Sequence, residues 1–439
     1  MSFSQAKKAV ADYFEFSRHS TTFKTEVIAG VSTFLALSYI FVVNPAILSE
    51  AGIDKSAVLF ATIVVSSILT IVMGLWAKTP FALAPGLEIN AYVAFFVVGA
   101  LGFSWQAALG AVFWSGVIFL ALTISGMREK IINAIPNEIK TGLAACVGVF
   151  LALISLKLAG ILLYDGIHLS AVGNLFTPAA AIFALGLITV FALDRMNVRG
   201  AVLLSIIFST VAAHALGLGV SGGEPVAISS EMLGAVFQLD FGIILNPRIW
   251  SVILLLFLVD FYGSIAKLIG LTRQTSIVGK DGKLPRMKEA LLVDGMGAVG
   301  GSVLGTTSVL TYVESGVGIG EGGRTGLVSV VCGVLMALFL VLTPLVNLVP
   351  LIATTGALLF VGMKIMPGFR ELAKRPAESA LIAVMAATVV LTFALDKAML
   401  VGLALEAARK VASGKVRELN PYLVGSIILL AIGIFLGSM

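Results

Sequence analysis

Runs of about 20 apolar residues follow one another along almost the whole chain, and this pattern limits the possible folds more than any other feature. A helix needs roughly 20 mainly apolar residues to cross a bilayer, and lipid offers no partner to free backbone N–H and C=O groups. Only 12% of the residues are charged, about half the share of roughly 25% that is usual in soluble domains. The sequence therefore predicts an all-α polytopic membrane protein. It has about fourteen expected spans: 26–48, 56–77, 80–102, 105–125, 137–158, 177–193, 198–217, 249–272, 287–304, 306–320, 325–347, 350–366, 377–395 and 397–412.

The two ends of the chain are treated separately. Residues 1–25 are charged and amphipathic, and they lack the apolar core and the cleavage site of a signal peptide. We expect them to be retained as a helix lying along the membrane surface. A further apolar stretch at 421–436 is either another span or an interfacial helix.

The charges are distributed unevenly between the loops. With the N-terminus in the cytoplasm, the cytoplasmic loops hold most Lys and Arg residues, among them Lys24, Lys78 and Lys288, whereas the opposite loops are mainly acidic, as at Glu50 and Asp54. The net charge of +5 therefore reflects the positive-inside rule and not a nucleic-acid partner. The pattern predicts a multi-pass protein of the cytoplasmic (inner) membrane whose N-terminus is cytoplasmic.

Two pairs of matched fragments indicate an internal duplication. Pro136 and Pro350 are each followed at +5, +6, +11 and +12 by Thr, Gly, Val and Gly, and the tetrapeptide Phe-Ala-Leu-Asp ends one span at 191–194 and another at 393–396. If each half has seven spans, an odd number, the second half is inverted relative to the first, as in many transporters. The expected segments are 1–25 (N-terminal), 26–217 (first repeat), 218–248 (connecting loop), 249–412 (second repeat) and 413–439 (C-terminal).

Two polar, glycine- and threonine-bearing stretches interrupt apolar spans. They are APGLEINAY at 84–92 and GTTSVLTYVESGVG at 305–318, and they contain Glu88 and Glu314. They fall in the third and tenth spans, which correspond in the two repeats. Interrupted helices at corresponding places indicate a binding site near the bilayer midplane, and an ionisable group at that depth is a functional candidate by default.

Several segments resemble one family of transporters. They are TTFKTEVIAGVSTFLALSYIFVVNPAILSEAGI at 21–53, APGLEINAY at 84–92, ALGAVFWSGVIFL at 108–120, DGKLPRMKEALLVDGMGAVGGSVLGT at 281–306 and TYVESGVGIGEGGRTGL at 311–327. The chain is similar to the azaguanine-type purine permeases, a branch of the nucleobase cation symporter-2 (nucleobase-ascorbate transporter) superfamily. The resemblance implies a fourteen-span, seven-plus-seven inverted repeat with a core and a gate domain. It also implies proton-coupled uptake of a purine base such as guanine, hypoxanthine or adenine, often by a homodimer.

The resemblance also implies roles for single residues. Asp260 matches the carboxylate of the family's eighth span, Asn90 the asparagine of the third, and Asp294 an acidic or amide residue early in the ninth. Glu314, with Ser315 beside it, matches the glutamate of the tenth span.

Three positions depart from the family pattern. The third-span motif usually reads APGMGLNAY, so Glu88 replaces a glycine. The eighth span usually reads close to VDMFDTIGT, so Gly263 stands where a second aspartate is common and Lys267 where a small hydroxyl residue is usual. Charge has been both removed and added near the expected pocket.

The eighth span places an acid and a base on one helical face. Asp260, Ser264 and Lys267 follow one another at i, i+4 and i+7, within a continuously apolar setting that turns this face inward. Asp260 and Lys267 form either a ligand-binding pair or a structural ion pair. A second option is that Lys267 neutralises Glu88 of the interrupted third span.

A purine base requires acceptors for its ring N–H groups, and Glu314 suits that role. Thr311 and Tyr312 of the same stretch are further binding candidates. Tyr312, Phe81 or Tyr92 could stack on the ring. For proton coupling, Asp260 is the first candidate and Glu314 the second. Asp294 either joins them or braces the interrupted tenth span by accepting its free N–H groups.

Other classes of site are disfavoured. The histidines His19, His168 and His214 lack metal-ligand spacing, and Cys146 and Cys332 lie in apolar spans, so neither a metal nor a cofactor is expected. Three alternatives remain, of which one is a receptor that does not transport. Another is an anion or other small-solute carrier of the same fold, which Lys267 would suit. The third is an intramembrane aspartyl enzyme using Asp260 and Asp294, although the sequence signatures of such proteases are absent.

Overall fold

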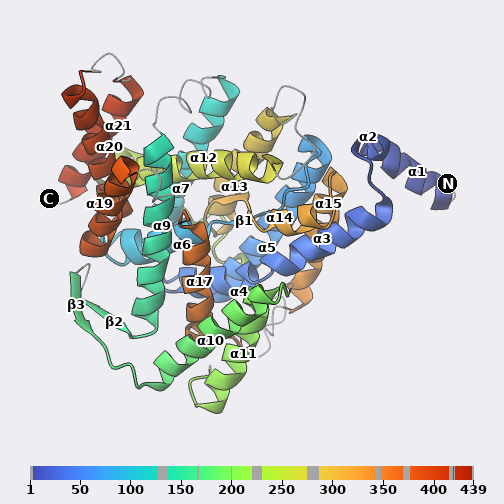
Figure 1. Cartoon of the computed structure of the whole chain (residues 1–439), viewed down its shortest axis with the longest axis horizontal. Coiled ribbons are helices and arrows are strands. Elements are labelled where there is room, and N and C mark those ends of the chain that lie inside the picture. Colours follow the sequence, from blue (N-terminus) through green and yellow to red (C-terminus); the bar gives the residue numbers. More distant parts are fainter. Residues whose placement is uncertain are drawn as a thin grey trace.

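The computed structural model of the chain describes residues 3–126, 137–165, 168–198, 200–219, 230–273, 286–342, 346, 348–368, 376–414, 419 and 421–437. Pro136 of the expected repeat, and parts of the expected segments 218–248 and 413–439, lie outside the described residues. Within them the chain is mostly helical (Figure 1).

The elements of the first half follow the expected spans closely. In chain order they are α1 (Phe3–Tyr13), α2 (Phe16–His19), α3 (Phe23–Leu37), α4 (Ile40–Ser49), α5 (Lys55–Val72), η1 (Met73–Ala77), β1 (Leu83–Pro85), α6 (Leu87–Ala91), η2 (Tyr92–Val98), α7 (Trp105–Ile124), α9 (Asn137–Leu158), β2 (Leu162–Asp165), β3 (His168–Val172), α10 (Pro178–Arg195) and α11 (Ala201–Ala215). β2 and β3 form an antiparallel hairpin between α9 and α10, which the sequence did not predict.

The second half has the same character. Its elements are η3 (Ser230–Leu233), η4 (Phe241–Leu245), η5 (Pro247–Ile249), α12 (Trp250–Arg273), α13 (Met287–Leu304), β4 (Val309–Thr311), α14 (Ser315–Gly320), α15 (Gly326–Leu338), η6 (Phe339–Leu342), η7 (Leu351–Thr354), α17 (Thr355–Ile365), α19 (Pro376–Thr392), α20 (Leu395–Ala412) and α21 (Pro421–Gly437). The apolar stretch 421–436, for which the sequence allowed either a span or an interfacial helix, forms helix α21.

Several of the long helices begin at a side chain that caps their first free N–H groups. The caps are Thr22 for α3, Asp54 for α5, Ser104 for α7, Thr177 for α10 and Thr325 for α15, and each accepts a hydrogen bond from a backbone N–H two or three residues further on. A helix leaves its first N–H groups without partners, so a polar residue just before an apolar run fixes where the helix starts. The expected span boundaries agree with these positions to within a few residues.

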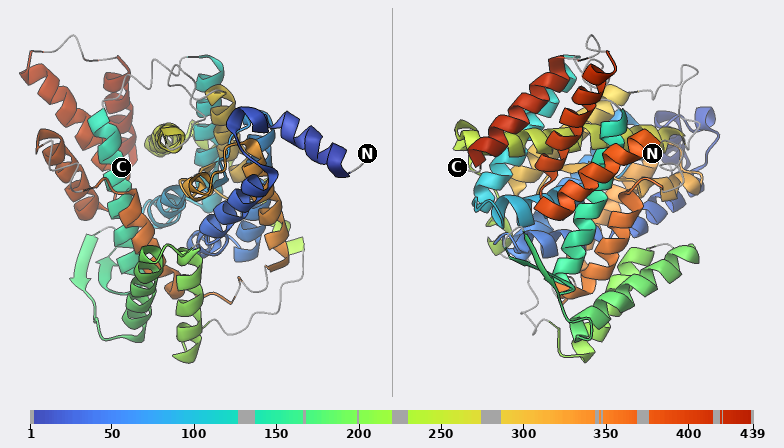
Figure 2. Two further views of the ribbon diagram at one scale, coloured as in Figure 1. Left: turned by 45° about the vertical axis from the view of Figure 1, so that its right-hand side comes forward. Right: turned by 60° about the vertical axis from the view of Figure 1, so that its left-hand side comes forward.

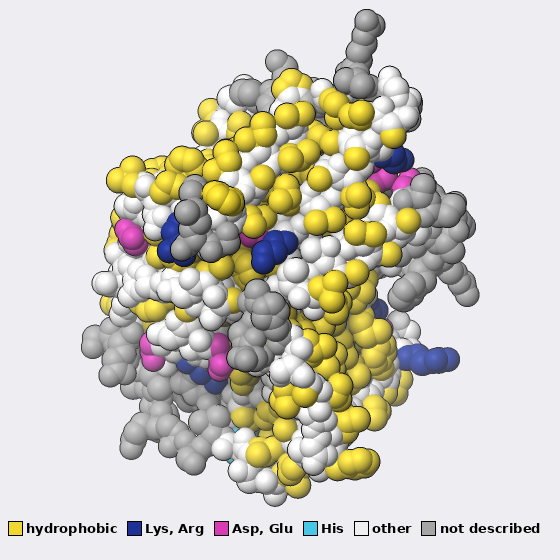
Figure 3. Space-filling model, turned by 90° about the vertical axis from the view of Figure 1, so that its left-hand side faces the viewer, with side chains coloured by type: hydrophobic (Ala, Val, Ile, Leu, Met, Phe, Trp, Pro, Cys, Tyr) yellow, Lys and Arg dark blue, Asp and Glu magenta, His cyan; other side chains and the backbone are white. Residues whose placement is uncertain are grey.

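The described helices include spans long and apolar enough to cross a membrane. Five segments satisfy both criteria: Phe23–Ser49, Lys55–Ala77, Trp105–Ile124, Thr141–Leu158 and Pro178–Arg195. Shorter apolar helices occur in both halves. Large hydrophobic side chains are also exposed, for example Ile188, Leu391 and Phe435, and Figure 3 shows hydrophobic side chains spread over one face of the molecule. Such a surface is expected for a protein that faces lipid.

Helices from the two halves pack together in two groups. In one group α3, α5 and α7 contact α13 and α15, and in the other α9 and α10 contact α17, while α9 also contacts α19. α12 packs on α7 of the first group and on α21. Figures 1 and 2 show α9, α19 and α20 on one side of the molecule and α3, α5 and α15 on the other. Of the interrupted stretches, β1, β4 and α14 contact α5, α13 and α3 of the first group, and α6 contacts α9 of the second.

Glycines allow the closest helix contacts in the second group. A Cβ added to Gly362 of α17 would lie 2.9 Å from the carbonyl oxygen of Gly148 of α9, and one added to Gly148 would lie 2.6 Å from that of Gly362. Gly142 of α9 faces Met385 of α19, whereas Gly356 of α17 faces the backbone of α10. These four glycines are the matched positions of the expected repeat.

The N-terminal helices lie outside the helical body. Figure 2 shows α1 reaching away from it, while Phe14 and Phe16 pack against Leu327 at the start of α15. A location on the membrane surface stays a prediction.

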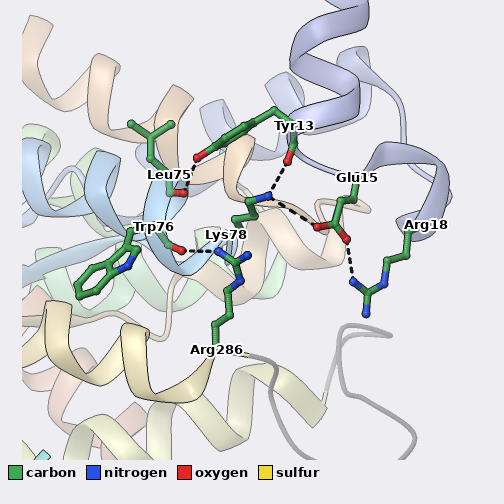
Figure 4. A network of polar contacts seen from close by, with 7 residues as sticks. All are labelled: Tyr13, Glu15, Arg18, Leu75, Trp76, Lys78 and Arg286. Carbon is green, nitrogen blue, oxygen red and sulfur yellow. Dashed lines mark hydrogen bonds and ion pairs between the residues drawn. The ribbon is translucent and has the colours of Figure 1, made fainter. Parts of the chain in front are cut away.

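A polar network fastens this segment to the end of the second expected span (Figure 4). The Tyr13 hydroxyl donates to the Leu75 carbonyl at 2.8 Å, and Lys78 Nζ donates to the Tyr13 carbonyl at 2.9 Å and lies 3.7 Å from Glu15. The hydrogen bond from Arg18 holds the pKa of Glu15 below its ordinary value. Because Lys78 lies in the short connection between η1 and β1, the N-terminal segment is fastened to the chain a few residues before the interrupted stretch.

Candidate functional site

Two extended segments meet at the centre of the candidate site. β1 and β4 pair antiparallel, with Ala84 opposite Leu310. β1 leads into α6, and β4 is followed closely by α14, so both stretches are interrupted helices. Strand pairing satisfies the backbone groups that the helices release, and both strands are fully buried. Irregular backbone is tolerated at membrane depth only when it is buried in protein in this way or lines a cavity.

Side chains from neighbouring elements hold the two strands in place. Asp294 Oδ1 of α13 accepts from the Thr311 backbone N–H at 3.0 Å and from its hydroxyl at 2.8 Å. Ser315 Oγ accepts from the Ala82 N–H at 2.9 Å, and the Tyr312 hydroxyl donates to a β1 carbonyl at 2.7 Å. Asp294 therefore makes the contacts expected of a residue that braces the interrupted tenth span by accepting its free N–H group. Thr311, Ser315 and Tyr312 likewise make contacts that support the backbone of the site.

Glu314 precedes α14 and is held by a residue that the sequence analysis did not identify. The Tyr39 hydroxyl, from the break between α3 and α4, donates to Glu314 Oε1 at 2.7 Å. Tyr39 is only 1% exposed, and Glu314 Oε2 is buried. A tyrosine in the middle of the expected span 26–48 was the available signal.

The polar face of α12 points into the protein. Asp260 and Ser264 are 3% and 1% exposed. Lys267 Nζ lies 3.1 Å from Glu88 Oε1 on α6, and it also lies 5.9 Å from the centre of the Tyr312 ring. The sequence left Asp260 and Glu88 as possible partners of Lys267, and in the structure Lys267 forms its ion pair with Glu88.

Asn90 is part of a buried polar layer beneath the strands. Its side-chain oxygen accepts a hydrogen bond from the Thr307 hydroxyl. In the same layer Asn44 Nδ2 donates to Thr62 Oγ1 at 2.6 Å and to Thr306 Oγ1 at 2.9 Å. The sequence analysis missed Asn44 and Thr307. The available signal for Asn44 was an amide side chain inside an apolar run, and for Tyr39 it was a hydroxyl in the same run.

The aromatic candidates differ in how free their rings are. Tyr92 stacks on Phe96 with ring centres 5.1 Å apart, so one of its faces is occupied. Phe81 is fully buried, and Tyr312 is 6% exposed. Of the three, Tyr312 lies beside both Lys267 and β1, which makes it the best placed to contact a ligand.

The site offers buried hydrogen-bond acceptors that no described residue uses. They are Asp260 Oδ1, Ser264 Oγ, Asp294 Oδ2 and Glu314 Oε2. A buried polar atom without a partner costs roughly 1–3 kcal/mol, so a ligand with N–H donors would recover this energy. Among the described residues, no group of three His, Cys, Asp or Glu side chains is arranged to hold a metal.

Interrupted helices, inward-facing carboxylates and a lipid-compatible surface are together typical of a polytopic membrane transporter. The family and the relatives described next identify the protein as a transporter and not an enzyme. Comparison with known proteins narrows this class. Residues 24–401 match the Permease family Xan_ur_permease. The chain is 40% identical over 414 residues to a protein of Methanocaldococcus jannaschii named "Putative permease MJ0326", covering 94% of this chain and 95% of that one. It is also 36% identical to the adenine permease AdeP of Escherichia coli (94% and 92% covered) and 34% identical to the guanine/hypoxanthine permease PbuO of Bacillus subtilis (96% and 100% covered).

The chain belongs to this permease family, in the purine permease branch of the nucleobase transporters. Solved structures of more distant proteins share the fold. The transmembrane domain of the cyanobacterial bicarbonate transporter BicA superposes with a TM-score of 0.62 at 17% identity, covering 86% of this chain and 97% of that domain. SLC26A9 superposes with a TM-score of 0.62 at 13% identity, covering 92% and 69%.

Proposed function

We propose that this protein takes up a purine nucleobase together with a proton across the cytoplasmic membrane by alternating access. The observation that carries the proposal is the meeting of the two interrupted stretches beside buried acceptors that lack partners. Ring N–H groups of a base fit such acceptors, and relatives named for adenine and for guanine/hypoxanthine transport match over nearly the whole chain.

The proposed roles of the residues follow from their contacts. Glu314 binds the base through Oε2 while Tyr39 holds its other oxygen. Asp260 carries the coupled proton, because burial makes an isolated charge there costly and its Oδ1 has no partner among the described residues. Glu314 and Asp294 are the further candidates for the proton. The remaining members of the proposed binding set are Asn90, Ser264, Thr311, Tyr312, Ser315 and Glu88.

The proposed architecture is a seven-plus-seven inverted repeat of fourteen spans. The matched glycines support it, because Gly148 of α9 faces Gly362 of α17, its counterpart in the second repeat. Gly142 faces α19 and Gly356 faces α10, which are themselves counterparts. A two-fold axis that relates the halves would exchange α9 with α17 and α10 with α19, so a contact of α9 with α19 should be matched by a contact of α17 with α10. The N-terminus is proposed to be cytoplasmic, and a homodimer is the proposed assembly.

The two packing groups support a division into a core and a gate domain. The core would comprise α3–α7 with α12–α15, and the gate α9–α11 with α17–α20. The proposed site then belongs to the core, and moving it against the gate exposes it to each side of the membrane in turn.

Uptake assays in cells without their own purine transporters test this function. Labelled hypoxanthine, guanine or adenine should accumulate, and a protonophore should abolish the accumulation. If no purine is taken up and none stabilises the purified protein, the proposal fails.

An anion or other small-solute carrier is the second candidate, which the cationic Lys267 and the fold shared with BicA favour. It predicts uptake of bicarbonate or sulfate that competing purines leave unchanged. A proton-coupled base carrier should ignore these anions.

A further inference from the structure

One ion pair joins the interrupted third span to the eighth. Lys267 Nζ of α12 lies 3.1 Å from Glu88 Oε1 of α6, and the two side chains are 19% and 12% exposed. They are therefore shielded from water but still reachable. Both residues depart from the family pattern given above, which has small neutral residues at these two positions.

The pair contributes hydrogen-bonding chemistry that the rest of the site lacks. The unpartnered atoms Asp260 Oδ1, Ser264 Oγ and Glu314 Oε2 suit N–H donors of a ligand. An ammonium group has three N–H donors and no acceptor, so Lys267 keeps donors free after binding Glu88. Among the described side chains that form the site, Lys267 is the cationic one.

Gly263 lacks a side chain at a place where a small one would fit. Gly263 is one turn before Lys267 on the same face of α12 as Asp260, and a Cβ built on it would meet no described atom within 4 Å.

Resting on the proposed function, we propose that Lys267, oriented by Glu88, selects 6-oxopurines over adenine. A 6-oxopurine presents two neighbouring acceptors, O6 and N7, and a lysine ammonium is a suitable donor to this edge. Its N1–H, adjacent to O6, is then directed to a carboxylate. Adenine carries an amino group in place of O6, which would point donor hydrogens at a cation. It can bind only with a different edge against Lys267.

A good pair of contacts to a base edge discriminates by roughly tenfold to hundredfold. We expect guanine and hypoxanthine to bind the purified protein at least about tenfold more tightly than adenine, with the same order in competition for uptake. Wild-type protein should also bind guanine several-fold more tightly than 7-deazaguanine, which lacks the N7 acceptor. This comparison needs no variant.

The variant test removes both charges at once, because deleting one leaves the other buried without its partner. E88Q/K267M preserves approximate side-chain volume, and K267R retains the cation. The matched control is D194N/K364M, which removes the ion pair between α10 and α17, 2.9 Å long and far more exposed. Thermal unfolding establishes that each variant is folded.

The proposal expects E88Q/K267M to bind guanine, hypoxanthine and adenine with similar dissociation constants. K267R and D194N/K364M should still bind guanine and hypoxanthine more tightly than adenine. Equal or tighter binding of adenine by the wild type overturns the proposal, as does an unchanged preference in folded E88Q/K267M. If E88Q/K267M does not fold, equal binding of guanine and 7-deazaguanine by the wild type decides against it. If the wild type binds no purine at all, the proposed function itself is refuted, which is a different result. If the wild type binds purines and folded E88Q/K267M binds none, the pair is needed for binding as such and the proposed role in selection is overturned.

Discussion

Tyr39→Phe is the most direct test of how Glu314 is positioned. The change removes a single hydroxyl, the donor that lies 2.7 Å from Glu314 Oε1, and keeps the ring that packs in the core. A hydrogen bond to a charged group contributes about 1.5–3 kcal/mol. Glu314 is half-buried, so we expect the lower end of this range, about 1.5 kcal/mol, or roughly tenfold in an equilibrium constant.

The dissociation constant of the base, measured by calorimetry on the purified protein, should therefore rise roughly tenfold in Tyr39→Phe. The KM of uptake should rise with it, while kcat changes less, because Tyr39 orients a binding group and does not carry the proton. Tyr13→Phe is the matched control, since it removes a hydroxyl bonded to Leu75 on the exposed N-terminal segment.

Two results would refute this reasoning. If Tyr39→Phe lowers thermal stability but leaves the dissociation constant unchanged, Tyr39 supports the fold and Glu314 does not bind the base through this geometry. If stability and affinity are both unchanged, the contact itself contributes nothing. Tyr13→Phe should leave base binding unchanged in every case.

Asp294→Asn keeps an oxygen that accepts from Thr311, so a purely bracing role predicts a folded and transporting variant, whereas a role in proton coupling predicts binding of the base without proton-driven accumulation. Asp294→Ala leaves the buried Thr311 N–H unsatisfied and should lower the free energy of unfolding by about 1–3 kcal/mol, measured by thermal or denaturant unfolding in detergent. Gly362→Ala forces a Cβ to within 2.9 Å of a backbone oxygen of α9 and should destabilise by about 1–3 kcal/mol, while Gly368→Ala, where no described atom lies within 4 Å, should not; equal stabilities would contradict the close packing of α9 and α17.

The sequence predicted most of the helices because apolar length and capping residues are local properties. The spans at 105–125 and 137–158 agree with α7 and α9, and the interruptions at 84–92 and 305–318 coincide with β1 and β4. Composition alone could not show that β1 and β4 pair with each other, because that pairing joins residues more than 200 positions apart.

Tyr39 and Asn44 were missed for a related reason. Both lie in the expected span 26–48, where a single polar residue reads as a tolerated interruption. Glu314, which accepts from Tyr39, and Thr306, one of the two partners of Asn44, lie in the second half. For Lys267 the sequence offered two partners, Asp260 and Glu88, instead of none. The distance of 3.1 Å between Lys267 and Glu88 distinguishes them. A polar residue in an apolar span indicates that a partner exists, but the fold determines which one.

Charge balance across the site restricts what can cross with the base. Glu88 and Lys267 compensate each other at 3.1 Å, whereas the hydrogen bonds recorded for Asp294 and Glu314 within the described residues come from neutral donors. Asp260 likewise has no ion pair among these residues. Keeping the buried Asp260 and Asp294 and the half-buried Glu314 all charged without counterions would cost more than the few kcal/mol that a neutral base can return through hydrogen bonds. This cost supports the proposal that a proton accompanies the base, and Asp260 is the residue proposed to carry it.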